Sequence, residues 1–210
     1  MKRKSSAAGS PRARPQRARI LEAAFASFMR RGFAATSTLD IATAANVSKR
    51  ELYAEFGSKE ALLGACIRAR AERMREPVRL AAVQDRAGLR ATLVAFGTAV
   101  LREASDPAVV GVFRLAIAEA TRAPQVGRLL ESAGRAPNRA ALAALLAQAQ
   151  ALGLIASGAA RDLAARFFAL LWGELMMRLL LRVATRPSAA EATRHARRAV
   201  EEFLALYGKS

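Results

Sequence analysis

The chain has few of the side chains on which most enzymes and metal sites depend. Its 210 residues include one cysteine and one histidine. A single cysteine excludes a disulfide framework and a cysteine-based zinc site within one chain. Neither Cys66 nor His195 has a partner from which a nucleophile–base pair or a metal site can be assembled in the sequence. We therefore expect no catalytic residues, no metal and no cofactor, and we do not expect an enzyme.

The positions of these two residues suggest ordinary roles. Cys66 lies on one helical stripe with Leu62, Leu63 and Ile67, so we expect it to be a small buried side chain. His195 stands between arginines on a polar segment, and we expect it at the surface.

Acidic residues are scarce, and the basic excess is uneven. Lysine and arginine number 34 against 17 aspartate and glutamate, which gives a formal net charge of +17. Much of this excess fits the bias of a GC-rich genome, because arginine far outnumbers lysine and alanine is abundant. The bias does not explain residues 1–19, which hold seven basic residues and no acid. We predict that residues 1–13 form a disordered basic arm that tracks DNA phosphates.

Long uninterrupted apolar runs are also missing. The most apolar stretch, residues 163–181, is interrupted by Arg166, Glu174 and Arg178, which a membrane span tolerates poorly. The basic N-terminus leads into no apolar segment of the kind found in secretory signals. The sequence predicts a soluble, cytoplasmic protein with no membrane partner.

Strand patterns are absent as well, and alanine and leucine dominate the second half of the chain. The predicted fold class is all-α, with an N-terminal three-helix head and a C-terminal helical domain. Pro77 is expected to end the fourth helix, and Pro137 is a point at which the seventh can divide. The predicted helices cover residues 17–31, 37–45, 48–56, 58–76, 88–104, 106–121, 125–150, 159–184 and 188–207.

The most informative stretch contains two short predicted helices joined by a tight turn. Ser37 and Asp40 stand three apart, which predicts a capping box at the start of the first helix. Asn46 lies at the turn, and asparagine tolerates the left-handed backbone that a sharp corner between helices needs. Ser48 and Glu51 predict a second capping box. This is the layout of a helix-turn-helix, whose second helix enters the major groove of DNA.

A longer set of residues in and around this motif carries a resemblance to a known family. These residues are Ile20-Leu21, Ala23-Ala24, Phe28, Gly32-Phe33, Thr36-Ser37, Asp40-Ile41-Ala42, Val47-Ser48-Lys49, Leu52-Tyr53, Phe56 and Ser58-Lys59-Glu60-Ala61-Leu62. Residues 14–74 resemble the DNA-binding segment of the tetracycline-repressor (TetR/AcrR) family of bacterial transcriptional regulators. The resemblance implies a DNA-binding domain over 14–74, with its helix-turn-helix at 37–56, and an effector-binding and dimerisation domain over 77–210.

Two residues depart from the family pattern. Asn46 stands where the family usually has glycine, and Glu51 stands where it often has threonine or another small residue. The Glu51 carboxylate either accepts a hydrogen bond from a cytosine amino group or closes the capping box. Both interpretations are open at this point.

The second helix of the motif and its surroundings supply the expected contacts with double-stranded DNA. We expect Arg50 to read a guanine, because its fork matches the O6 and N7 acceptors, while Tyr53 and Lys59 hold phosphates. The full set of expected DNA-binding residues is Thr36, Ser37, Thr38, Ser48, Lys49, Arg50, Glu51, Tyr53 and Lys59.

The two last predicted helices carry broad apolar faces, which either pair with a second copy or bury within one subunit. In the resembled family the last two long helices of each subunit form a four-helix bundle across a two-fold axis. We therefore expect a homodimer on a palindromic operator. The expected interface residues are Phe168, Leu171, Trp172, Leu175, Met176, Leu179, Val200 and Phe203.

The family usually holds a small-molecule effector between the middle helices of this domain. The residues expected to line such a cavity are Phe96, Val100, Phe113, Ile117, Leu130, Leu142 and Phe167. We expect a small apolar or amphipathic effector, and we expect Arg114 and Glu119 to face water. The sequence thus predicts a ligand-responsive transcriptional regulator, and the resemblance favours a repressor. The alternative is a basic protein that coats DNA without sequence preference, with steep salt dependence.

Overall fold

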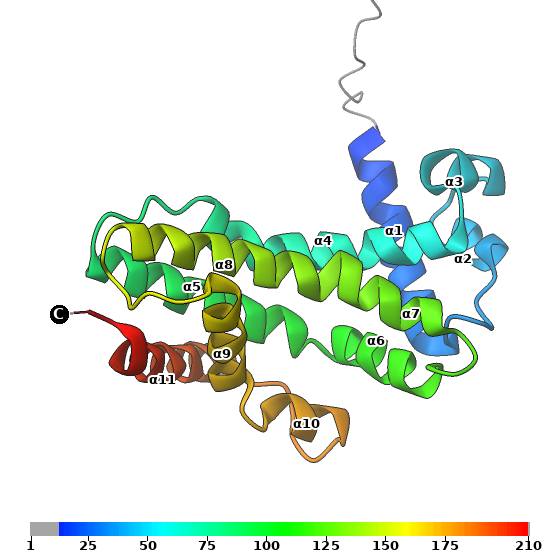
Figure 1. The fold of residues 1–210 in the computed structure, drawn as a ribbon. Helices are drawn as coiled ribbons and strands as arrows, with labels where there is room; N and C mark the ends of the chain where they lie inside the picture. The colour runs from blue at the N-terminus through cyan, green and yellow to red at the C-terminus, as the bar shows by residue number, and fades with distance from the viewer. Residues whose placement is uncertain (1–12, 210) are drawn as a thin grey trace, which may run out of the picture. The chain divides into compact units, whose positions relative to one another are not determined.

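A computed structural model describes residues 13–209. All the regular elements that it contains there are helices, as predicted. The helices are α1 (Ala13–Arg31), α2 (Thr38–Ala44), α3 (Lys49–Phe56), α4 (Lys59–Arg79), α5 (Arg86–Ala104), α6 (Pro107–Ala118), α7 (Pro124–Leu129), the π-helical turn η1 (Leu130–Arg135), α8 (Ala136–Ala151), α9 (Ala160–Trp172), α10 (Leu175–Leu180) and α11 (Ala189–Tyr207) (Figure 1). Residues 1–12 of the predicted basic arm lie outside the described residues, and Ala13 is the first residue of α1.

The chain divides into two compact units between Cys66 and Ile67, so α4 begins in the first and ends in the second. In the first unit α1 packs on α2, and α2 on α3. Its core contains the fully buried side chains of Ile20, Ile41 and Leu52. Cys66 is buried, as predicted.

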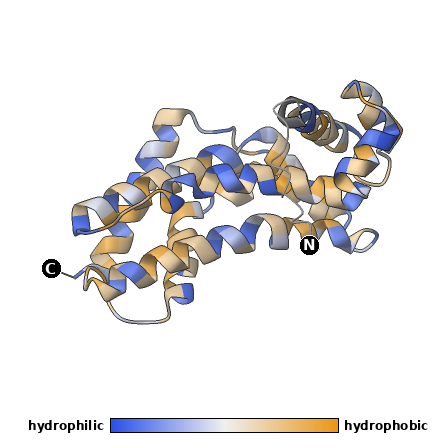
Figure 2. Ribbon diagram, turned by 90° about the horizontal axis from the view of Figure 1, so that it is seen from above, coloured by the Kyte–Doolittle hydropathy of each residue, from blue (hydrophilic) through white to orange (hydrophobic). Residues whose placement is uncertain are grey.

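In the second unit α11 packs against α5 and α9, and α8 packs against α9. Phe96, Phe167 and Phe203 are fully buried where these helices meet, and the rings of Phe167 and Phe203 lie 5.5 Å apart. Most helices carry both apolar and polar residues (Figure 2), as expected of helices with one buried face. Among residues 13–209, no helix is both long and apolar enough to cross a membrane.

The prediction of one helix over 159–184 is wrong. α9 ends at Trp172, Gly173 takes a φ of 43°, and the short helix α10 follows. Glycine adopts a positive φ without the clash that a Cβ atom causes, so it ends a helix readily. The predicted exposure of Arg114 to water is also wrong. Its Nε and Nη2 groups donate to the carbonyl oxygens of Leu180, at 3.0 Å, and Leu179, at 2.5 Å, which close the end of α10.

Neither proline interrupts its helix as the sequence suggested. α4 continues through Pro77 and ends two residues later, so the predicted end at Glu76 is wrong. A proline this close to the end of a helix removes one hydrogen bond and leaves little helix beyond it to disrupt. The predicted helix over 125–150 is not split at Pro137 either. α7, η1 and α8 follow one another without a break, since Leu130 and Ala136 keep right-handed helical φ and ψ, and Pro137 lies in the first turn after the π-helical segment.

Candidate DNA-binding interface and ligand pocket

The start of α2 differs in detail from its prediction. Ser37 is its N-cap, and its Oγ accepts a hydrogen bond from the Leu39 N–H at 3.1 Å. The predicted capping box with Asp40 is wrong, because the Asp40 carboxylate forms an ion pair with Arg31 at the end of α1. Asn46 takes a φ of 53°, which confirms the left-handed turn expected between α2 and α3.

The capping box at the start of α3 is confirmed. The Glu51 N–H donates to Ser48 Oγ at 3.1 Å, and the Ser48 N–H donates to Glu51 Oε2 at 2.7 Å. Hydrogen bonding to the side chain and then the backbone of Ser48 lowers the pKa of Glu51 from its ordinary value. The carboxylate therefore serves the helix start, which is the capping interpretation. A base contact by Glu51 stays a prediction.

Two cations stand exposed at the first positions of α3. The Lys49 ammonium lies 5.8 Å from the ring centroid of Tyr53, one turn along the same face. Arg50 has no hydrogen bond or ion pair with any residue of the described part of the chain, so its guanidinium is available to a ligand. The hydroxyl of Tyr53 lies 3.2 Å from Thr38 Oγ1, which fixes the ring beside Lys49.

Buried and paired side chains hold the other face of α3. Leu52 and Phe56 are buried, as predicted. Arg17 of α1 stacks over the Phe56 ring, with its guanidinium carbon 4.8 Å from the centroid, and forms an ion pair with Glu55. The sequence analysis did not find Arg17, because its partners lie more than 35 residues away. These contacts fix α3 so that its Lys49–Arg50 end faces solvent.

Two residues predicted to contact DNA, Thr36 and Lys59, bond within the connection between α1 and α2, and their DNA contacts stay predictions. Thr36 is buried, and its hydroxyl donates to the Gly32 carbonyl at 2.6 Å. Lys59 Nζ lies within hydrogen-bond distance of three carbonyl oxygens, those of Phe33 at 3.0 Å, Thr36 at 3.2 Å and Ala34 at 3.3 Å. An ammonium group has three donors, so these contacts use all of them. This geometry favours a role in holding the connection over the predicted phosphate contact by Lys59.

Replacing Lys59 by methionine tests this role. We expect the free energy of unfolding to fall by about 1–3 kcal/mol, because three carbonyl oxygens lose a charged donor. We expect the salt dependence of DNA binding to stay unchanged. Urea unfolding followed by circular dichroism measures the first, and binding isotherms at several salt concentrations measure the second. Lys49→Met is the control. Because Lys49 is exposed, its replacement should lower the slope of log binding constant against log salt concentration and barely change the free energy of unfolding. If Lys59→Met lowers this salt slope by about one and leaves the free energy of unfolding unchanged, the predicted phosphate contact of Lys59 is supported.

Two protein-family models match this chain. The family model of bacterial regulatory proteins of the tetR family matches residues 20–66, which include α2 and α3. The model of the AefR-like transcriptional repressor C-terminal domain matches residues 91–209, more than half of the chain. The chain belongs to the tetR family. It is therefore a DNA-binding transcriptional regulator with a helix-turn-helix, whose second helix is the capped helix α3.

Solved structures of other regulators resemble most of the chain. A transcriptional regulator from Mesorhizobium loti is 31% identical, with a TM-score of 0.76, and the match covers 96% of this chain and 100% of that one. A regulator from Agrobacterium tumefaciens is 28% identical, with a TM-score of 0.76 and coverage of 96% and 97%. The flavonoid-responsive regulator FrrA is 28% identical, with a TM-score of 0.67 and coverage of 92% and 97%. No curated protein sequence matches significantly.

The residues predicted to line an effector cavity differ in burial within the second unit, and a cavity around them stays a prediction. Phe96, Val100 and Phe167 are buried, and the rings of Phe96 and Phe167 lie 6.3 Å apart. Phe113 is half-buried, and Ile117 is 65% exposed. Leu142 is buried and Leu130 half-buried. Phe96 and Phe167 therefore belong to the packed core of this unit.

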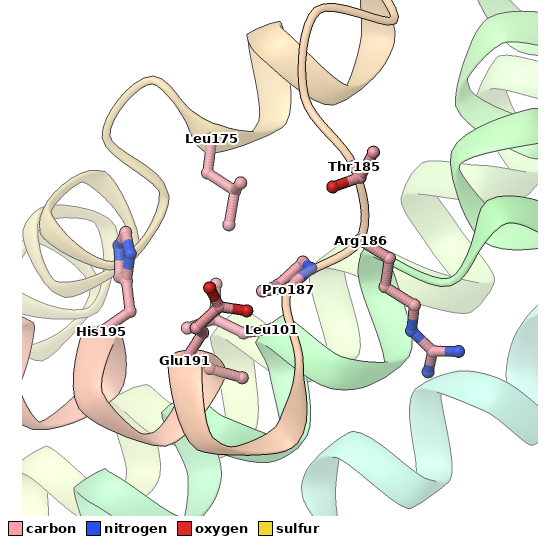
Figure 3. Close-up of a pocket in the computed structure, with 8 residues that line it drawn as sticks. Leu101, Leu175, Thr185, Arg186, Pro187, Glu191 and His195 are labelled. Atoms are coloured by element: carbon pink, nitrogen blue, oxygen red, sulfur yellow. The ribbon is translucent and has the colours of Figure 1, made fainter.

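A pocket of about 200 Å³ lies elsewhere in this unit (Figure 3). It is lined by Leu101, Leu175, residues 185–187, Glu191, Ala192 and His195. His195, which was expected at the surface, is half-buried, and its ring lines one side of this pocket (Figure 3). The sequence analysis missed this pocket because residues 181–188 lie outside regular helix and show no periodic pattern. In the described part of the chain, no three His, Cys, Asp or Glu side chains are grouped to hold a metal.

The residues predicted for the dimer interface divide into two groups. Leu171, Leu179, Val200 and Phe203 are buried within their own chain, whereas Phe168, Trp172, Leu175 and Met176 are half-buried. More exposed apolar side chains lie in α10 and directly after it in the sequence. These are Met177, Leu181 and Val183, which are 59%, 64% and 62% exposed.

Proposed function

We propose that this tetR-family regulator is a repressor that binds a palindromic operator as a homodimer and is released by a small molecule. The observation that carries the proposal is the start of α3, where a capping box presents Lys49 and Arg50 to solvent without an acidic partner. Acidic side chains near them are already engaged, since Glu51 caps the helix and Glu55 pairs with Arg17. The exposed surface is therefore cationic, as phosphate and guanine recognition require.

Within this proposal the residues of the interface take different roles. Arg50 reads a guanine through its two-pronged fork, and Lys49 and Tyr53 hold phosphates beside it. Ser37 and Ser48 are the N-caps of α2 and α3, and the free backbone N–H groups at these helix starts attract phosphate. Thr36, Thr38 and Lys59 keep the motif in shape, since their polar atoms bond within the chain.

The segment 175–183 supports dimerisation through a second copy. It exposes Met177, Leu181 and Val183 together with half-buried Leu175 and Met176, and solvent-exposed apolar side chains in one segment are typical of an interface. A two-fold dimer places two recognition helices about one turn of DNA apart, which matches a palindrome.

Replacing Leu181 by lysine tests this dimer surface. A charge buried at an apolar interface is costly, so we expect the dimer dissociation constant to rise at least about tenfold. Analytical ultracentrifugation measures it. Leu152→Lys is the matched control, because Leu152 is also half-exposed and lies after α8. An unchanged dimer in Leu181→Lys, or equal weakening in both variants, would contradict this surface.

The repressor role and the response to an effector are supported by comparison alone. The matching C-terminal model describes a transcriptional repressor domain, and FrrA is described as flavonoid-responsive. A reporter gene placed behind the bound site decides between repression and activation. Expression should fall when the protein is present, and a rise would mean that it activates.

Selection of random duplex DNA by the purified protein at physiological salt tests the proposed operator. We expect enrichment of a palindrome with two half-sites about ten base pairs apart. Tight, salt-sensitive binding without any enrichment would instead support sequence-independent coating, the alternative function.

A further inference from the structure

Two large apolar side chains of the first unit are exposed to solvent. Among residues 16–66, Leu39 is 58% exposed and Tyr53 is 40% exposed, whereas the other large apolar side chains there are buried or half-buried. A single exposed leucine is common on protein surfaces, so its position decides whether it has a role. Leu39 lies in α2, the first helix of the helix-turn-helix, and Tyr53 lies in α3, the second.

A contact between these two helices places the start of α2 beside the cationic face of α3. Thr38, the residue before Leu39, has its Oγ1 3.2 Å from the hydroxyl oxygen of Tyr53. The centroid of the Tyr53 ring lies 5.8 Å from the ammonium group of Lys49. The two exposed apolar residues therefore both lie next to the surface that the proposed function assigns to DNA.

The position of Leu39 in α2 also sets the direction of its side chain. Leu39 is the second residue of the helix, and its N–H donates to Oγ of the N-cap Ser37 at 3.1 Å. The Cα–Cβ bonds of an α-helix tilt toward its N-terminus, so the Leu39 side chain leans toward the start of α2. This is the end of the helix that contacts Tyr53.

An alkyl side chain limits what Leu39 can recognise on DNA. It carries no donor or acceptor, so a phosphate placed against it would lose water without gaining a hydrogen bond. The base edges in the major groove offer one apolar group, the C5 methyl of thymine. Contact between this methyl group and Leu39 removes apolar surface of both from water, which stabilises the complex.

We infer that Leu39 is a specificity-determining residue that contacts a thymine methyl group in each half-site of the operator. The inference rests on the proposed function, because it requires a duplex seated on α3. A guanine and a thymine belong to different base pairs, so Leu39 adds a position to the one proposed for Arg50. The contribution of Leu39 involves no charge, which distinguishes it from the phosphate contact of Lys49.

Removal of the methyl group from the operator tests the contact directly. In the palindrome enriched by selection, each thymine position is replaced in turn by uracil in both half-sites. Uracil lacks the C5 methyl but keeps the hydrogen-bonding groups of thymine. At one position the affinity of the wild type should fall about fourfold for each half-site, the expected effect of one buried methyl group. Competition binding at one salt concentration measures the change.

Leu39→Ala supplies the protein side of the test. The variant should bind the thymine operator about fourfold or more weakly for each half-site, and uracil at the identified position should weaken it no further. Its salt dependence should match that of the wild type, because no charge is lost. Its free energy of unfolding should barely change, because the Leu39 side chain is exposed.

Leu80→Ala is the matched control for this variant. Leu80 is 70% exposed and follows the end of α4, outside the helix-turn-helix. The control should keep both the affinity of the wild type and its response to uracil. An equal loss of affinity in Leu80→Ala would show that the loss in Leu39→Ala is not specific to the start of α2, which would overturn the inference.

5-Methylcytosine separates the methyl group from the rest of thymine. A cytosine–guanine pair at the identified position should weaken binding by the wild type. 5-Methylcytosine carries its methyl group on the same ring carbon as thymine, so it should regain about fourfold for each half-site. Leu39→Ala should bind the methylated and unmethylated duplexes equally, and a preference for the methylated duplex in this variant would assign the methyl contact to another residue.

The outcomes separate this inference from the proposed function. If selection enriches a palindrome in which no thymine is sensitive to uracil, the inference is overturned and the proposed function stands. A Leu39→Ala variant that loses the same affinity for the thymine and uracil operators would place Leu39 against sugar carbons, which also overturns it. Enrichment of no sequence by the wild type contradicts the proposed function itself, and this inference with it.

Discussion

Replacing Arg50 by alanine should reduce affinity for the selected operator by about 1–3 kcal/mol for each half-site and relax the preference at one base pair. Arg50 is the exposed cation of α3 without a partner among the described residues, and a two-pronged contact with guanine discriminates against other bases by this amount. Binding to DNA of unrelated sequence should weaken much less. Titration of both duplexes at one salt concentration measures the two effects.

Arg50→Lys is the matched control for this prediction. Lysine keeps the positive charge but lacks the planar fork, so binding to unrelated DNA should persist while the preference is lost. Replacing the contacted guanine by 7-deazaguanine removes its N7 acceptor and should weaken the wild type but not Arg50→Ala. If Arg50→Ala keeps the full preference, the assignment of base reading to Arg50 is wrong.

Replacing Phe167 by alanine should lower the free energy of unfolding by about 3–5 kcal/mol. Its ring is fully buried and packs against Phe96, Phe168 and Phe203, with centroids 6.3, 6.2 and 5.5 Å away. Truncation leaves a cavity that the surrounding helices cannot close fully. Urea unfolding followed by circular dichroism and by the fluorescence of Trp172, the only tryptophan, measures the loss.

Phe168→Ala gives the comparison for this core position. Phe168 is half-buried next to Phe167, so its truncation should cost clearly less. A Phe167→Ala variant as stable as the wild type would show that Phe167 is not core. Such a result would favour the sequence-based expectation of an effector cavity around Phe96 and Phe167.

The helix-turn-helix was predictable because its signals are local. The Ser48–Glu51 box and the left-handed Asn46 both follow from residues within three positions of one another. The apolar spacing of Leu52 and Phe56 likewise fixes which face of α3 is buried. Family resemblance added the functional interpretation, and local physical chemistry supplied the geometry.

The errors arose where distant side chains compete for one group. Asp40 suits a capping box, but Arg31 forms an ion pair with it. The phosphate contact of Lys59 stays a prediction, but three carbonyl oxygens of the α1–α2 connection within hydrogen-bond distance of its ammonium group show how distant groups compete for it as well. Such choices depend on tertiary contacts, which periodicity does not record.

The break at Gly173 and the pocket beside α11 were missed for related reasons. A glycine within an apolar pattern often stays in a helix, so the pattern over 159–184 outweighed it in the sequence analysis. The pocket joins Leu101 to residues 175–195, and that approach exists only once α5 packs on α11.

The ratio of affinities for the selected operator and for unrelated duplex of equal length tests the central claim most directly. Both are measured with the wild-type protein at the same physiological salt concentration. A recognition helix that reads base edges predicts a ratio of about 10³ or more. A ratio near one would contradict the account, because α3 would then hold phosphates without reading the sequence.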